Sequence, residues 1–281
     1  MNNGSTDHNR QRKAAVINDF SSFGRCSLAV TLPILSALKV QCCSVPTAIF
    51  TNHTGFEHFS WTDYTDHMDA YIRDWQATGL RFDAIATGFL GSARQIGFVR
   101  RFIEAFRGPD TLVFVDPVMG DYGRLYATYD MSLAESMREF LDVADVLTPN
   151  LTEACVLAGC DYDPAMSDRG LKELCEKLTS RHATRVVVSG ISRGADLINY
   201  LYERGRNPTS VVAPKLGEDR SGTGDVFSSV ILGRLVRGER FEEAVWSAAD
   251  FVSKAVERTI EMKLPATDGL AIEEVLGCLC D

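Results

Sequence analysis

Long apolar runs are missing from this chain of 281 residues. Spanning a bilayer takes about 20 consecutive apolar residues, and no stretch of the sequence reaches that length. Positive charge is also scarce, because 29 Lys and Arg stand against 38 Asp and Glu and give a formal net charge of −9. An acidic chain lacks the broad basic surface that attracts nucleic acids or anionic membranes. We therefore expect no nucleic-acid partner and no membrane partner, and any phosphate-binding site has to be local.

Cysteines in paired metal-binding spacings are also missing. The eight cysteines are Cys26, Cys42, Cys43, Cys155, Cys160, Cys175, Cys278 and Cys280. Most of them lie in apolar segments, which predicts reduced thiols in the core. Cys278 and Cys280 could bind a metal or form a disulfide, and the sequence leaves this open.

The sequence contains no internal repeat, no low-complexity segment and no signal-peptide pattern. Residues 1–12 are polar, so we expect a loose N-terminal tail followed by one domain over residues 13–281. The missing signal pattern predicts a cytoplasmic location.

Apolar, β-branched segments alternate with amphipathic segments along most of the chain. Buried strands are predicted at residues 13–18, 41–48, 83–88, 111–116, 144–148 and 185–189. Helical spacing marks residues 64–77, 93–106 and 241–259, and a hairpin is predicted from residues 197–202 and 210–213. This alternation predicts an α/β fold, in which helices flank a central, mainly parallel sheet on both faces.

The most informative stretch is Ser221-Gly222-Thr223-Gly224-Asp225. Apolar residues follow it at helical spacing, so the glycines lie at a helix N-terminus. Backbone N–H groups and the positive end of the helix dipole favour a phosphate there. The carboxylate of Asp225 would repel that phosphate unless it takes a proton from a hydroxyl that attacks the phosphoryl group. An ordinary glycine turn, with Asp225 stabilising the dipole, is the alternative interpretation.

Two groups of oxygen ligands follow neighbouring strands. Asp116 and Asp121 lie in the turn after one strand, and Asn150 and Glu153 follow the next. Ligands of such sheets bind beyond the C-terminal strand ends, and Mg²⁺ prefers oxygen ligands. The two groups therefore predict a site for Mg²⁺ and phosphate. Each group alone is also compatible with a proline turn or with a helix N-cap and its capping-box Glu.

The order of six segments resembles that of pyridoxal kinases in the ribokinase-like superfamily. The segments are Thr51-Asn52-His53-Thr54-Gly55, Thr87-Gly88-Phe89, Asp116-Pro117-Val118-Met119-Gly120-Asp121, Thr148-Pro149-Asn150-Leu151-Thr152-Glu153, Val188-Ser189 and Gly222-Thr223-Gly224-Asp225. The third and the last mark the wider superfamily, whereas Asn-His-Thr-Gly indicates the vitamin B6 branch. The resemblance implies ATP-dependent phosphorylation of the 5′-hydroxymethyl group of pyridoxal, pyridoxamine or pyridoxine, with ATP as co-substrate.

The resemblance also implies roles for individual residues. Asp225 would be the general base, and the amides of Gly222, Thr223 and Gly224 would stabilise charge on the γ-phosphate. Mg²⁺ and the ATP phosphates would be bound by Asp116, Asp121, Asn150 and Glu153, with Thr148 beside a monovalent cation and Ser189 bonded to a phosphate. The ring pocket would contain Phe50, Thr54, Phe89 and Tyr126. Since the family is typically dimeric, a homodimer is implied.

Two positions depart from the family pattern. Asn18-Asp19 stand where a small hydroxyl residue is usual, and Phe89 stands where a tyrosine is common. We expect Asp19 to bind a cationic group of the vitamer, either the pyridinium nitrogen or the ammonium of pyridoxamine, unless it only caps a turn near Ser21. His53 has no nucleophile or metal ligand spaced near it, which favours a structural histidine.

Several alternatives stay open. Phe50 and Phe89 could be core aromatics instead of ring contacts, and residues 58–61 could form a flap or an ordinary surface loop. A hydroxymethylpyrimidine kinase of the same superfamily is the nearest alternative activity. A non-catalytic B6-binding protein is another, although a binding protein would not need the base Asp225.

Overall fold

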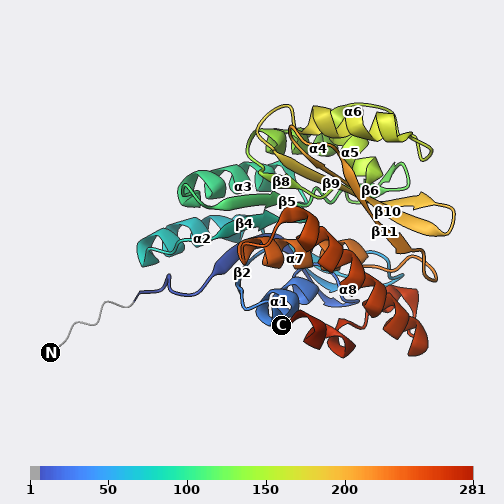
Figure 1. The fold of residues 1–281 in the computed structure, drawn as a ribbon. Helices are drawn as coiled ribbons and strands as arrows, with labels where there is room; N and C mark the ends of the chain where they lie inside the picture. Colours follow the sequence, from blue (N-terminus) through green and yellow to red (C-terminus); the bar gives the residue numbers. More distant parts are fainter. Residues whose placement is uncertain (1–6, 281) are drawn as a thin grey trace.

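A nine-stranded sheet runs through the centre of the computed structural model, which describes residues 7–280 (Figure 1). The strand order is β11-β10-β9-β8-β5-β4-β1-β2-β3. These strands are β1 (Lys13–Phe23), β2 (Gln41–Asn52), β3 (Trp61–Asp63), β4 (Ala84–Thr87), β5 (Leu112–Val115), β8 (Val146–Leu147), β9 (Arg185–Arg193), β10 (Asp196–Glu203) and β11 (Thr209–Pro214). Neighbours from β9 to β2 pair in parallel, whereas β3, β10 and β11 pair antiparallel. The predicted α/β fold with a mainly parallel sheet is confirmed.

Helices cover both faces of the sheet (Figure 1). One face carries α1 (Leu28–Ala37), α7 (Thr223–Val236) and α8 (Phe241–Glu261). The other carries α2 (Thr65–Thr78), α3 (Ala93–Phe106), α4 (Met131–Ser136), α5 (Leu151–Ala158) and α6 (Asp168–Leu178). A separate ribbon pairs β6 (Gly120–Asp121) with β7 (Arg124–Leu125), and 3₁₀ helices span Met137–Asp142, Ala266–Asp268, Ile272–Glu274 and Leu276–Leu279.

The first part of β1 shows why residues 14–17 are all apolar. Ala14 and Val16 belong to the core with α1, α7 and α8, while Ala15 and Ile17 belong to the core on the other face. Successive side chains of a strand point to opposite faces, so a strand buried on both sides needs apolar residues at every position.

Two strands extend beyond their predicted ends. β1 continues to Phe23 and β2 to Asn52, and their pairing shifts register between Asn18 and Phe20. Residues 19–23 alternate little in polarity, so periodicity alone did not reveal this irregular extension. At the sheet edge, Trp61 begins β3 and pairs with Phe50. The segment 58–61, predicted as a flap or loop, therefore ends in a strand.

The predicted loose tail is only partly described, because residues 1–6 lie outside the described residues. The remainder, residues 7–12, contacts the domain. Asn9 Nδ2 donates to the Gly79 carbonyl (3.0 Å), the Arg81 amide donates to Asn9 Oδ1 (2.9 Å), and Arg12 donates to the Val236 carbonyl. Asn9 and Arg12 are therefore hydrogen-bonded to the domain, and the looseness of the tail stays a prediction.

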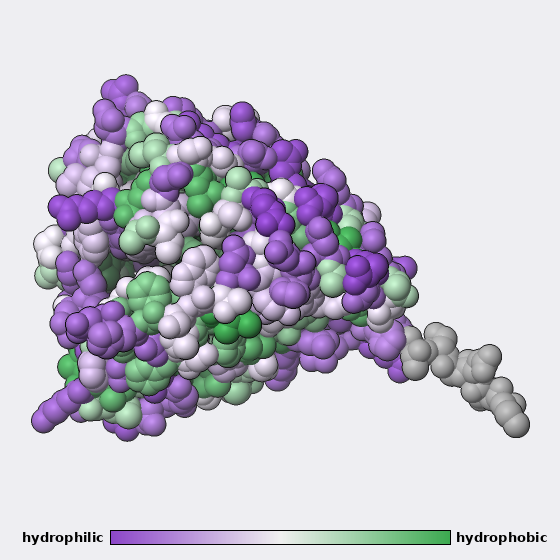
Figure 2. Space-filling model, turned by 180° about the vertical axis from the view of Figure 1, so that it is seen from behind, coloured by the Kyte–Doolittle hydropathy of each residue, from purple (hydrophilic) through white to green (hydrophobic). Residues whose placement is uncertain are grey.

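Within residues 7–280, no helix combines the length and the apolar character needed to cross a membrane. Figure 2 shows one face of the molecule, where hydrophilic groups surround smaller hydrophobic patches. All eight cysteines are free thiols. Burial of Cys26, Cys155 and Cys175 agrees with the prediction that most cysteines are core thiols, whereas Cys160, Cys278 and Cys280 are exposed. Cys160 follows the end of α5, Cys278 lies within the last 3₁₀ helix and Cys280 follows it.

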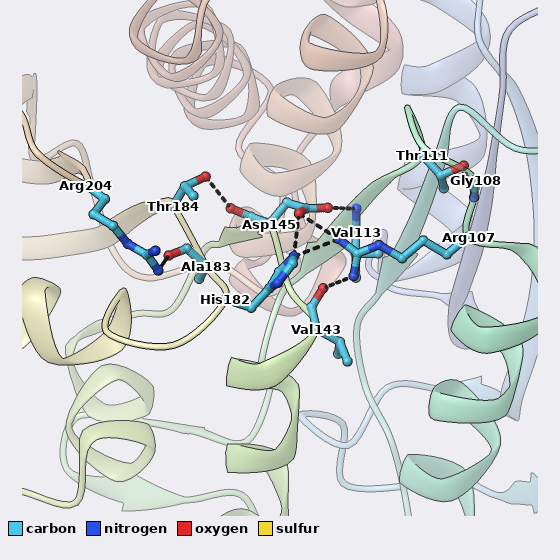
Figure 3. Close-up of polar contacts among 10 residues, drawn as sticks. All are labelled: Arg107, Gly108, Thr111, Val113, Val143, Asp145, His182, Ala183, Thr184 and Arg204. Carbon is cyan, nitrogen blue, oxygen red and sulfur yellow. Dashed lines mark hydrogen bonds and ion pairs between the residues drawn. The ribbon is translucent and has the colours of Figure 1, made fainter.

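Asp145 joins three segments at the N-terminal ends of the strands (Figure 3). Its carboxylate accepts hydrogen bonds from the Val113 amide (2.7 Å) and Arg107 Nη2 (2.8 Å), and it lies 3.0 Å from His182 Nε2. Arg107 also donates to the Val143 carbonyl (2.8 Å). The cluster therefore connects the end of α3 to β5 and β8.

Asp145→Ala should lower the free energy of unfolding by about 2–4 kcal/mol, because the Val113 amide and the Arg107 guanidinium would lose a partly buried charged partner. Urea denaturation measures this loss. The matched control is Asp142→Ala, which removes a 3.0 Å pair with Arg181 whose side chains are 53% and 58% exposed. An exposed pair is worth less than about 1 kcal/mol, so equal losses in the two variants would contradict the prediction.

Candidate active site

A cavity of about 470 Å³ opens at the C-terminal ends of the strands. It is lined by every residue predicted for catalysis, ATP or metal binding: Asp116, Asp121, Thr148, Asn150, Glu153, Ser189, Gly222, Thr223, Gly224 and Asp225. Tyr126, predicted for the ring pocket, also lines it. The structure thus brings together side chains from four separate parts of the sequence, at the sheet edge where ligands of α/β folds bind.

Gly222 lets the chain enter α7 at this cavity. It is the N-cap residue with φ of 76°, and a Cβ added there would lie 2.1 Å from the Arg25 carbonyl oxygen. Only glycine accommodates both the left-handed backbone and this close approach. The first turn of α7 leaves its amides without intrahelical partners, so they are available to an anion in the cavity.

Asp225 lies in the first turn of α7, beside those amides. Burial raises the pKa of its carboxyl above the ordinary value, while the Ser27 amide and the side chain of Asn18 stabilise the charged form and lower it. A carboxylate with a raised pKa is a stronger base than an exposed one. The site therefore places a carboxylate that could accept a proton next to a helix end suited to an anion.

Asp116 follows β5 and is buried. Burial and the nearby charge of Asp225 raise its pKa to about 7, against hydrogen bonds from Ser228 and Thr148 that lower it. The hydroxyls of Thr148 and Ser228 lie 3.2 Å apart. The floor of the cavity therefore contains carboxylates that repel each other.

Glu153 and Asn150 form a complete capping box at the start of α5. Glu153 accepts from the amides of Asn150 (2.8 Å) and Met119 (3.1 Å), and Asn150 Oδ1 accepts from the Glu153 amide (3.0 Å). Asn150 Nδ2 also donates to the Gly120 carbonyl (2.7 Å). Burial, followed by the charge of Asp116, raises the Glu153 pKa. The capping alternative for this pair is confirmed, and the same two residues also line the cavity.

Asp121 and Ser189 lie at the rim of the cavity. The Asp121 carboxylate accepts from the Tyr122 amide (2.7 Å), and burial raises its pKa. The hydroxyl of Tyr122 donates to Asp219 (2.6 Å). Ser189 lies within β9 and forms a parallel bridge with Asn150, and its amide donates to the Pro149 carbonyl (2.9 Å). Both side chains lie close enough to the cavity to contact a bound nucleotide.

Removing the Asp116 charge should change how stability depends on pH. Folding raises this pKa from 3.8 to about 7, so the folded state holds the proton more tightly than the unfolded state. The free energy of unfolding of the ligand-free protein therefore falls as pH rises through this interval. Asp116→Asn should gain stability relative to the wild-type protein as pH rises from 3.8 to about 7, measured by thermal unfolding at each pH. A stability difference that stays constant with pH would contradict the assignment.

The predicted ring-pocket residues do not share one cavity. Phe50 is buried, stacks on Trp61 (5.5 Å between ring centroids, 11° between planes) and meets Phe89 edge-on (6.1 Å). Thr54 is exposed on the segment after β2, whereas Tyr126 lines the large cavity. Phe50, Trp61 and Phe89 therefore pack against one another, and the Phe89 amide donates to Asn18 Oδ1. Contact of Phe50 and Phe89 with a vitamer ring stays a prediction.

Asp19 and His53 have local hydrogen-bond partners. Asp19 is 5% exposed and accepts from the Ser21 hydroxyl (3.1 Å). Burial raises its pKa to about 6, with a smaller contribution from the charge of Asp225. His53 Nε2 lies 2.8 Å from the Thr267 carbonyl, and the Gly55 amide donates to its Nδ1 (3.0 Å). The prediction of a structural histidine is confirmed.

Sequence analysis missed two groups of residues at the site. Asn18 was noted only as a departure from the family, yet its side chain contacts Asp225. The cavity wall on α8 consists of Ala249, Val252, Ser253 and Val256. Their helical spacing predicted a buried face, but spacing alone does not distinguish a face that packs in the core from one that lines a cavity.

The residues fit a bound cation. Asp116, Glu153 and Asp225 form no ion pair with any residue in the described part of the chain. Burying carboxylates without a positive partner costs free energy, and neighbouring carboxylates also repel each other. A divalent ion would reduce both effects. No group of three His, Cys, Asp or Glu among residues 7–280 could hold an ion by itself. An ion here would therefore share its ligands with water and the phosphates of a nucleotide.

The fold and the cavity define the class of protein: a kinase of the ribokinase-like superfamily, with a parallel sheet and a carboxylate beside an anion-binding helix end. This chain belongs to the phosphomethylpyrimidine kinase family, whose model matches residues 32–268.

Solved structures and sequence relatives agree with this family. A "putative phosphomethylpyrimidine kinase" from Bacteroides thetaiotaomicron is 39% identical, with a TM-score of 0.95 and coverage of 98% of this chain and 96% of that chain. A second crystal form of that protein, with pyridoxal, is 38% identical to this chain, with a TM-score of 0.93 and coverage of 96% of each chain. The pyridoxine/pyridoxal/pyridoxamine kinase of Bordetella avium is 29% identical, over 88% of this chain and 86% of its own length. The hydroxymethylpyrimidine/phosphomethylpyrimidine kinase of Bacillus subtilis is 28% identical, over 88% of this chain and 90% of its own length.

Proposed function

We propose that this chain transfers the γ-phosphoryl group of ATP to the 5′-hydroxymethyl group of pyridoxal, pyridoxamine or pyridoxine. One observation carries the proposal: the Asp225 carboxylate lies in the first turn of α7, in the same cavity as the amides of Gly222, Thr223 and Gly224. The presence of pyridoxal in the structure of the Bacteroides relative supports a B6 vitamer as the acceptor.

The proposed reaction follows from this geometry. The vitamer hydroxyl attacks the γ-phosphorus, the bond between that phosphorus and the ADP oxygen breaks, and Asp225 accepts the hydroxyl proton. The amides at the start of α7 stabilise the negative charge on the phosphoryl oxygens. The apolar wall on α8 and Leu197 would contact the adenine, while Ser189 and Asn150 would contact phosphate.

Mg²⁺ would be held by Asp116 and Asp121 together with the phosphates. Bound there, it would neutralise phosphate charge. Both carboxylate oxygens of Glu153 already accept backbone amides, so we propose that Glu153 acts on the ion through water. Thr148, beside Ser228, is the proposed neighbour of a monovalent cation. A homodimer and a cytoplasmic location stay predictions, and analytical ultracentrifugation would test the first.

A second candidate is phosphorylation of hydroxymethylpyrimidine, favoured by the family model and by the Bacillus subtilis relative. A coupled ADP-release assay with the three B6 vitamers and hydroxymethylpyrimidine separates the two activities. We expect a kcat/KM for at least one vitamer that exceeds the value for hydroxymethylpyrimidine. The reverse order would favour the second candidate, and no ADP release with any of them would favour a B6-binding protein.

Asp19→Ser should reduce kcat/KM for pyridoxamine more than for pyridoxine, because a charge-assisted hydrogen bond to the amine adds roughly 1 kcal/mol, about fivefold, over a hydroxyl. Steady-state kinetics with both vitamers provides the comparison. The bond between Asp19 and Ser21 supports the competing role in a local turn. Equal losses with the two vitamers would favour that role or a contact with the ring nitrogen that both share.

A further inference from the structure

The side-chain amide of Asn18 lies between three segments at the active site. Asn18 Nδ2 donates to Asp225 Oδ1 (3.3 Å), and Asn18 Oδ1 accepts from the amides of Phe89 (2.7 Å) and Asp19 (2.9 Å). The side chain belongs to a residue only 4% exposed. It therefore links β1, the segment after β4, and α7.

The orientation of this amide is determined by its partners. Two backbone N–H groups require an acceptor, so the oxygen of Asn18 must face them and the NH₂ group must face Asp225. Gly88 provides the space, because a Cβ there would lie only 2.4 Å from the Asn18 amide group. The donor directed at the carboxylate is therefore held in place before any substrate binds.

We propose that Asn18 is a positioning residue for the general base. It holds Asp225 Oδ1, so that the carboxylate keeps one orientation toward the cavity, and the inference rests on the proposed role of Asp225. A hydrogen bond from the Ser27 backbone also stabilises the charged form of this carboxylate and lowers its pKa. Asparagine meets both requirements at position 18, because leucine has no donor and aspartate would place a second negative charge against the base.

A double-mutant cycle tests the proposal with Asn18→Leu, Asp225→Asn and the combined variant, using ATP and the best vitamer. Asn18→Leu should lower kcat at least about 10-fold, with KM for both substrates within about threefold. If Asn18 acts only through Asp225, the combined variant should be within about twofold of Asp225→Asn alone. If the fold-loss in kcat of the combined variant equals the product of the two single losses, the proposal is overturned. A normal kcat for Asp225→Asn would instead overturn the proposed function itself.

A matched control separates positioning from loss of stability. Gln95 is also a buried amide, 1% exposed, which donates to the Thr47 carbonyl (2.9 Å) and accepts from the Gly91 amide (2.7 Å). Gln95→Leu should lower the melting temperature but leave kcat within about twofold, because Gln95 does not contact Asp225. If Asn18→Leu does not fold, Asn18→Ala removes the same donor without adding a charge beside Asp225. A normal kcat in that variant would overturn the proposal, and a loss of 10-fold or more, again not multiplied by Asp225→Asn, would support it.

Discussion

Asp225→Asn is expected to lower kcat by about 100-fold or more, while the KM for ATP stays within a few-fold. The amide has almost the same size as the carboxylate but cannot accept the proton of the attacking hydroxyl. The proposed nucleotide contacts of Asn150, Ser189 and the α7 amides, which all line the cavity, are left unchanged by the substitution. Initial rates of ADP release at saturating vitamer, with ATP varied, measure both quantities.

A control for this variant is Asp219→Asn, which removes the same charge from the wall of the same cavity. Asp219 is exposed and accepts a hydrogen bond from the Tyr122 hydroxyl. It has no part in the proposed proton transfer. Its kcat should change by less than about threefold, since an exposed charge acts only through a screened field. Near-normal turnover of Asp225→Asn, or an equal loss in both variants, would refute the assignment of Asp225 as the base.

Gly222→Ala is expected to cost about 3 kcal/mol or more of unfolding free energy, the sum of a left-handed backbone penalty and a severe overlap. The new Cβ would lie 2.1 Å from the Arg25 carbonyl oxygen, which belongs to the backbone and cannot rotate away. The Arg25 segment would have to move, and with it the start of α1. Urea denaturation followed by circular dichroism measures the loss.

Gly224→Ala is the control for stability, because it lies in the same helix turn two residues later. A Cβ there meets no atom within 4 Å, and the residue does not have a positive φ. Alanine should leave the free energy of unfolding unchanged or raise it by up to about 1 kcal/mol through its helix propensity. Similar losses in both variants would show that the close contact at Gly222 is not what requires glycine.

Local patterns were sufficient to predict the fold class and the helix N-terminus that opens on the cavity. The apolar segments at residues 111–116 and 185–189 coincide with β5 and with the first part of β9. The glycines before a helical pattern placed Gly222 at the start of α7. Such features depend on periodicity and backbone conformation, which neighbouring residues determine. The ends of parallel strands then necessarily meet at one sheet edge, so Asp116 and Asn150 could be expected in one cavity.

Contacts between distant segments were not predictable in this way. The aromatic residues Phe50, Trp61 and Phe89 pack against one another through the pairing of β2 with β3, and the short edge strand β3 carries no periodic signal. The cavity wall on α8 has the same helical spacing of apolar residues as a helix face that packs in the core. Which neighbour covers an apolar face is decided by packing, and packing has no local signature in the sequence.

The sequence by itself therefore determined the α/β fold class, the helix N-terminus suited to phosphate, and the carboxylate beside it, because each depends on residues close together in the chain. Only the tertiary structure decided that Asn18 holds Asp225, since these residues are 207 positions apart and meet through the packing of β1, Gly88 and α7. The tertiary structure also decided that both carboxylate oxygens of Glu153 accept hydrogen bonds from backbone amides. Hydrogen bonds at such separations form only once the sheet has brought its strands together.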